Sequence, residues 1–152
     1  MNISLDLLKK LREETSAGVS DCRQALEDAA GDYEKAKKLL ISRGIEKAAK
    51  KEGKETSQGV IESYVHATGK VGVLVQLGCE TDFVARNEEF KKLAHEVALQ
   101  IAAMDPKDVK ELLATPSIRD GKTTIAEMVK TTIAKVGENI TIVRFSRLSM
   151  EV

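Results

Sequence analysis

Side chains that could act as acids, bases, nucleophiles or metal ligands are few in this sequence and lie far apart along it. The two histidines, His66 and His95, and the two cysteines, Cys22 and Cys79, form no cluster with metal-ligand spacing. The sequence also lacks a glycine-rich phosphate-binding loop. The residue types therefore argue against an enzyme and predict no catalytic residue, no metal and no cofactor.

The most distinctive stretch is Cys79-Glu80-Thr81-Asp82-Phe83-Val84-Ala85-Arg86-Asn87. It follows an alternating apolar segment, residues 71–77, which predicts a strand, and precedes a helical apolar stripe over residues 90–101. A phenylalanine beside an aspartate at such a joint either fills the core or protrudes toward a partner. The residue types alone favour a buried Phe83 and a helix-capping Asp82, and they leave the protruding arrangement open.

Composition restricts the class of protein. The 152 residues include 24 basic and 24 acidic side chains, 42% hydrophobic residues and 3% aromatic residues, which suit an aliphatic core. A net charge of zero argues against a dedicated nucleic-acid binder. No apolar run approaches the roughly 20 residues of a membrane span, and the first residues lack a signal-peptide pattern. We therefore expect a cytoplasmic protein with free thiols, and neither a membrane nor a direct nucleic-acid partner.

Residues 1–44 predict three short helices, which must pack on each other because each is too short to be stable alone. Gly18 is expected to end the first helix, Ser20 to cap the second, and Gly44 to end the third. The pattern resembles a ubiquitin-associated (UBA)-like three-helix domain. The lysine-rich residues 45–58 then predict a linker that is partly helical and partly flexible, whose lysines are expected to be solvated, with a ribosome or RNA contact as the alternative.

Residues 59–152 predict a core domain of the dimerisation type that begins with a β-hairpin. Its strands are expected over residues 60–67 and 71–78, with Gly69 in the turn. A helix over residues 87–103 follows, with Asn87 as its N-cap.

The rest of this domain predicts more helix and one more strand. Pro106 fits the first position of a short helix, and Thr124 with Glu127 forms a capping box. Residues 140–145 predict a third strand, which must join the hairpin. The expected fold class is α+β: an N-terminal three-helix UBA-like bundle, then a three-stranded antiparallel sheet with helices packed on one face.

Four stretches resemble elongation factor Ts, the family of guanine-nucleotide exchange factors for elongation factor Tu. They are residues 11–26, 43–51, 79–87 and 137–145, in the family's order and over nearly the whole chain. The third, Thr-Asp-Phe-Val-Ala-Arg-Asn preceded by Cys-Glu, is the most specific. Two departures are visible: Val19-Ser20 stands where the family commonly has Met-Met, and residues 104–122 are shorter than the corresponding stretch of the family.

The resemblance implies a protein that binds elongation factor Tu, both GDP-bound and nucleotide-free, and promotes GDP release without chemical catalysis. It implies that Phe83 is a wedge that disturbs the partner's magnesium and phosphate site. The implied contact residues are Thr81, Asp82, Phe83, Val84, Arg86 and Asn87, and at the N-terminal tip Gly18, Val19 and Ser20. A homodimer through the core sheet is also expected, with either sheet face as the contact. The alternative is a UBA-like adaptor or ribosome-associated binding protein without exchange activity.

Overall fold

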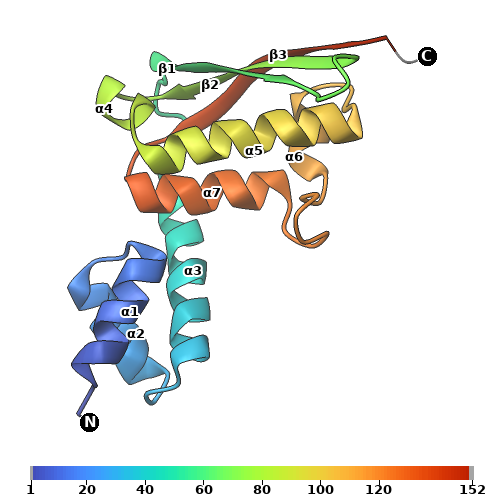
Figure 1. The fold of residues 1–152 in the computed structure, drawn as a ribbon. Coiled ribbons are helices and arrows are strands. Elements are labelled where there is room, and N and C mark those ends of the chain that lie inside the picture. Colours follow the sequence, from blue (N-terminus) through green and yellow to red (C-terminus); the bar gives the residue numbers. More distant parts are fainter. Residues whose placement is uncertain (1, 151–152) are drawn as a thin grey trace.

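One long helix, α3 (Tyr33–Ala49), connects a small helical bundle to an α+β unit, as Figure 1 shows. The structure is a computed structural model and describes residues 2–150. The first part of α3 packs with α1 (Leu5–Thr15) and α2 (Val19–Asp28). The bundle core is made of small and aliphatic side chains, namely Leu8, Leu11, Cys22, Ala25, Leu26, Ala29, Ala36 and Leu40. Three short helices therefore share one core.

The α+β unit is a three-stranded antiparallel sheet covered on one face by helices (Figure 1). The sheet order is β1 (Gln58–Val65), β2 (Val71–Cys79) and β3 (Ile140–Ser149), so the last strand joins the hairpin as predicted. The helices are α4 (Asp82–Ala85), α5 (Glu88–Met104), α6 (Val109–Ala114) and α7 (Ile125–Val136). The α+β fold class is confirmed.

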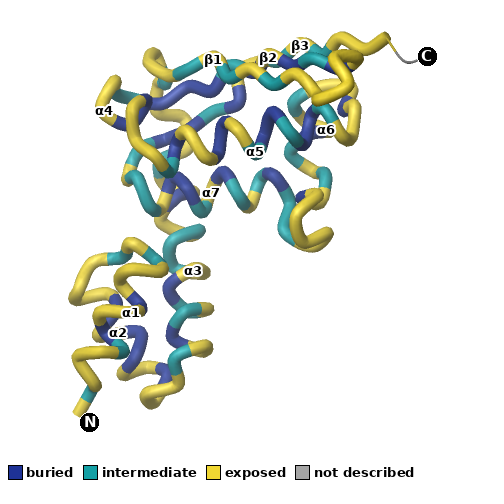
Figure 2. Tube along the Cα trace, in the orientation of Figure 1, coloured by how far each residue is buried: buried dark blue, intermediate teal, exposed yellow. Residues whose placement is uncertain are grey.

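The two faces of the sheet differ in what covers them. The β2 residues Val73, Val75 and Leu77 are buried in the core with α5 and α7 (Figure 2). The alternate residue Leu74 is 53% exposed, and Leu148 of β3 is 78% exposed. Within the described residues, the face opposite the helices is thus left open, with large apolar side chains on it.

The predicted end of the third helix at Gly44 is wrong. Helix α3 continues through Gly44 to Ala49, so the helical part of the stretch 45–58 belongs to α3 itself. A Cβ at residue 44 would lie 3.0 Å from the Cβ of Ala134 in α7. The missing side chain therefore allows a close approach of two helices, whereas the sequence suggested a helix stop. The division of the chain into two domains stays a prediction.

Two further helix ends were predicted wrongly. Ser16 takes the left-handed conformation (φ 57°) after α1, and Gly18 is the extended N-cap of α2, so Ser20 lies inside that helix. A short polar side chain such as serine tolerates the left-handed region when its amide is bonded, here to the Arg12 carbonyl at 2.8 Å.

The start of the helix after α5 also differs from the prediction at Pro106. Asp105 follows the last residue of α5, takes the left-handed conformation (φ 47°) and redirects the chain before Pro106. Helix α6 therefore begins only at Val109, with Asp108 as its N-cap. The Asn87 cap and the capping box that opens α7 are both confirmed.

We expect Gly44→Leu to destabilise the packing of α3 on α7. Overpacking costs about 1–3 kcal/mol, which outweighs the roughly 0.8 kcal/mol that leucine gains over glycine in helix propensity. Thermal unfolding is expected to shift down by about 2–8 °C. Ser42→Leu, on an exposed position of the same helix, serves as the control. Equal melting temperatures for the two variants would show that the Gly44–Ala134 approach is not tight.

Candidate functional site

Phe83 protrudes from the protein. Its side chain is 89% exposed, although it is one of only three phenylalanines in the sequence. The interpretation of Phe83 as a core residue is therefore wrong. The alternative reading of Asp82 as only a helix cap is wrong too, because the N-cap of α4 is Thr81, whose hydroxyl accepts a hydrogen bond from the Val84 amide at 3.4 Å. An exposed phenylalanine in solution suits contact with a partner.

The turn that carries Phe83 is anchored from below by its own neighbours. Val84 and Ala85 are buried in the core between sheet and helices. Val84, one of the predicted contact residues, therefore supports the turn from inside. Asp82 forms an ion pair with Arg86, and both side chains are largely exposed beside Phe83. The outer surface of the turn thus combines an aromatic ring with one acidic and one basic group.

Two glutamates hold the turn against the start of β3. The Glu138 carboxylate accepts the Thr81 amide at 2.9 Å and the Thr81 hydroxyl at 2.7 Å. In return, the Glu80 carboxylate accepts the Asn139 amide at 2.8 Å, and Lys54 lies 4.0 Å from Glu80. The segment that leaves β2 and the segment that enters β3 are thus joined beyond the last strand pair.

Asn139 and Asn87 complete the frame. Asn139 is buried and donates its side-chain amide to the Lys54 carbonyl at 2.8 Å. Asn87 accepts the Glu89 amide at 2.8 Å and begins α5 directly after the turn. Asn139 therefore fixes the backbone at Lys54, whereas Asn87 fixes the start of α5 after Phe83 and combines this role with an exposed side chain.

Cys79 lies directly under the turn. Its thiol is fully buried and donates to the Thr81 carbonyl at 3.2 Å. Burial raises the pKa of the Cys79 thiol, and the nearby Glu138 carboxylate raises it further. The thiol is therefore held in its unreactive protonated form. Both cysteines are buried and unpaired, as predicted.

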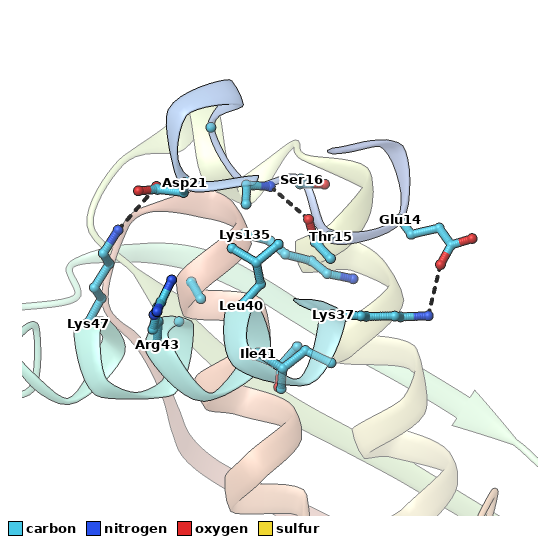
Figure 3. A pocket seen from close by; sticks show the side chains of 15 residues that line it. Glu14, Thr15, Ser16, Asp21, Lys37, Leu40, Ile41, Arg43, Lys47 and Lys135 are labelled. Carbon is cyan, nitrogen blue, oxygen red and sulfur yellow. Dashed lines mark hydrogen bonds and ion pairs between the residues drawn. The ribbon is translucent and has the colours of Figure 1, made fainter. Parts of the chain in front are cut away.

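The second predicted contact region is the loop before α2. Gly18, Val19 and Ser20 are all exposed, so this tip is open to a partner. Beside it lies a cleft of about 350 Å³ between the bundle and α7, shown in Figure 3. Lysines of α3 in this cleft pair with acidic groups, Lys37 with Glu14 and Lys47 with Asp21. Paired charges of this kind make no phosphate site.

Sequence reasoning did not assign roles to Glu80 and Glu138. Both flank predicted strands that must pair antiparallel, and this signal could have placed them opposite each other. The reciprocal bonds themselves could not be read from the sequence, because they depend on how the chain leaves each strand.

Comparisons with known proteins identify relatives of this chain. The model of the family described as elongation factor TS matches residues 80–152, which include the turn and both glutamates. The chain is 40% identical to elongation factor Ts of Coprothermobacter proteolyticus, over 99% of each chain, and 41% identical to that of Leptospira biflexa, over 99% of this chain and 98% of the other. Identity to the Koribacter versatilis protein of that name is 38%, over 99% and 89%.

This chain belongs to the elongation factor Ts family. Its 152 residues align over 195 positions with these relatives, which therefore carry residues that this chain lacks. None of the helices that the structure describes has the length and apolar character of a membrane span.

We expect Cys79 to be protected from thiol reagents in the folded protein. In a Cys22→Ala variant, its reaction with a disulfide reagent at pH 8 should be at least about 100-fold slower in buffer than in urea, because the thiol is buried and its pKa is raised. The pKa of the Cys79 thiol is higher in the folded protein than in the unfolded protein, where it is about 8.5. The contribution of this thiol to the free energy of unfolding is therefore complete below that pH and is lost as the pH rises through the folded pKa. Equal rates in buffer and urea would show that the turn opens freely.

Proposed function

We propose that this chain is a guanine-nucleotide exchange factor that binds GDP-bound and nucleotide-free elongation factor Tu and promotes GDP release. Membership of the elongation factor Ts family supports the partner, and the exposed Phe83 on an anchored turn supports the mechanism. Phe83 acts as a wedge in the GTPase domain, where it disturbs the magnesium and phosphate site, with Asp82 and Arg86 as its polar neighbours. No chemical catalysis is required of the chain.

Exchange requires only differential binding. A protein that binds the nucleotide-free partner better than the nucleotide-bound partner weakens nucleotide affinity by the same factor, because the coupling is reciprocal. No proton transfer and no nucleophile are needed. The function then depends on the shape and position of the contact residues.

Phe83 alone does not supply enough energy. A thousandfold acceleration of GDP release needs about 4 kcal/mol of differential stabilisation, at about 1.36 kcal/mol per tenfold. Burying one phenylalanine contributes about 1.5–3 kcal/mol. The rest comes from lost magnesium contacts in the partner and from the second contact region at Gly18, Val19 and Ser20. Val19 and Ser20 offer less apolar surface there than the methionines common in the family.

The open sheet face supports a homodimer. Ile61, Val65, Leu74 and Leu148 are large apolar side chains that are exposed on the strands, and an open apolar sheet face is commonly a protein interface. We place the dimer contact on this face, because Val73, Val75 and Leu77 are already buried against the helices. A twofold axis through the face would place two Phe83 turns in one particle.

We expect Phe83→Ala to fold like the parent and to lose about tenfold to hundredfold of the exchange activity, which matches the burial energy of one phenylalanine. The assay is release of a fluorescent GDP analogue from purified elongation factor Tu of the same species, at substoichiometric amounts of this protein and several magnesium concentrations.

Leu5→Ala is the matched control, because Leu5 is also an exposed large apolar residue but lies on α1. Unchanged exchange by Phe83→Ala would refute the wedge. No exchange even by the parent would favour a binding protein without exchange activity, such as an adaptor that acts through the N-terminal bundle.

We expect Leu74→Asp to shift a dimer to a monomer. A carboxylate in the middle of an apolar interface would be buried without a partner, at a cost of several kcal/mol. Light scattering after size exclusion at micromolar concentration measures the mass. The control Ser42→Asp introduces the same change of charge on an exposed position of α3. A parent protein that is already monomeric under these conditions would remove the dimer proposal.

A further inference from the structure

We propose that Glu138, together with Glu80, is a positioning residue that sets the direction of Phe83. The inference rests on the proposed function for its effect on exchange, while its effect on the turn is independent of that function. Glu138 lies 55 positions after Phe83 in the sequence, and it acts through Thr81 and not by contact with the partner.

The first argument concerns the end of the β2–β3 ladder. The last strand pair is Cys79 with Ile140, and beyond it the two chains separate into the Phe83 turn and the turn after α7. The amides of Thr81 and Asn139 would be left without ladder partners there. Each is bonded instead by the glutamate that precedes the other amide, Glu138 for Thr81 and Glu80 for Asn139. The two glutamate side chains thus continue the hydrogen bonding between the two segments beyond the last β2–β3 pair.

The second argument concerns helix α4. It has four residues, and a helix of this length has no stability of its own. Phe83 is 89% exposed, so few protein contacts of its own ring fix where the ring points. Its direction therefore follows the backbone of α4, which is held by the buried Val84 and Ala85 on the inside and by Thr81 at the N-cap.

Thr81 connects Glu138 to this helix. Its hydroxyl donates to Glu138 and accepts from the Val84 amide, so the carboxylate orients the hydroxyl for its capping role. Its amide donates to the second oxygen of the same carboxylate. Because both groups of Thr81 are donors, the ionised carboxylate accepts both at once. A glutamine at position 138 would offer one acceptor oxygen and would turn its NH₂ toward one of these donors.

The direct test uses a tryptophan at position 83. The sequence contains no tryptophan, so Phe83→Trp introduces a single reporter at the end of the turn. We expect time-resolved anisotropy to show an increase of about twofold in the amplitude of nanosecond motion when Glu138→Gln is added. Glu52→Gln removes the same charge from an exposed position and should change nothing. Identical amplitudes in all three proteins, at unchanged melting temperature, would overturn the proposal.

The functional test is a double-mutant cycle. Glu138→Gln is expected to reduce stimulation of GDP release about tenfold in the parent and to have almost no effect when Phe83→Ala is already present. Thr81→Val loses the hydroxyl that donates to Glu138 and should resemble Glu138→Gln. An equal loss with and without Phe83 would show that Glu138 acts independently of the wedge and would overturn the inference.

The two tests separate the two proposals. If Phe83→Ala exchanges like the parent, the wedge assignment fails, and the anisotropy comparison still decides whether Glu138 positions the turn. If Glu138→Gln does not fold, Thr81→Val takes its place in both experiments, because it removes a single hydroxyl of the same pair.

Discussion

The direction of an exposed aromatic ring cannot be set by its own packing, and this constraint explains much of the structure around Phe83. The ring makes few contacts within the chain, so its position depends on backbone held elsewhere. This backbone is held within a few residues by the buried Val84 and Ala85 and by Thr81, the N-cap of α4. A partner that binds such a ring loses less conformational entropy than it would with a freely moving side chain. Under the proposed function, rigidity at this turn therefore contributes to affinity before any contact with the partner is made.

A rigid backbone also fixes the distance between the two predicted contact regions, the Phe83 turn and the tip at Val19. Helix α3 is continuous from the bundle to the α+β unit, and the approach of Gly44 to Ala134 packs it directly on α7 (Figure 1). A flexible linker at this point would let the tip at Val19 move independently of Phe83. Because the chain is helical at this point, the tip and the turn are held at a preset separation; under the proposed function, the second contact then forms without a further search of linker conformations.

Periodicity and capping residues predicted the helices and strands well, because those signals are local. The strand pattern around Val73, the Asn87 cap and the capping box at Thr124 each depend on residues a few positions apart. The predicted helix end at Gly44 was wrong because the role of Gly44 depends on Ala134, which is 90 positions away. The exposure of Phe83 was likewise beyond local signals. A phenylalanine among apolar neighbours is usually buried, and only the resemblance to elongation factor Ts predicted that Phe83 is exposed.

Polar side chains fix the connection between α5 and α7. Gln100 is buried in α5, and its side chain bonds Thr115, the Pro116 carbonyl and the Ile118 amide at 2.8–3.1 Å. One buried amide thus satisfies the backbone of the loop that leads into α7, and Arg119 fixes the same loop to α5 through two bonds to Glu96 at 2.9 Å. Near the end of α5, Arg147 of β3 donates to the Ala102 carbonyl. Buried polar groups of a connection need hydrogen-bond partners, and these side chains supply them. The contacts lie toward the opposite end of α5 from Asn87, so the connection to α7 and the Phe83 turn are fixed by separate sets of residues.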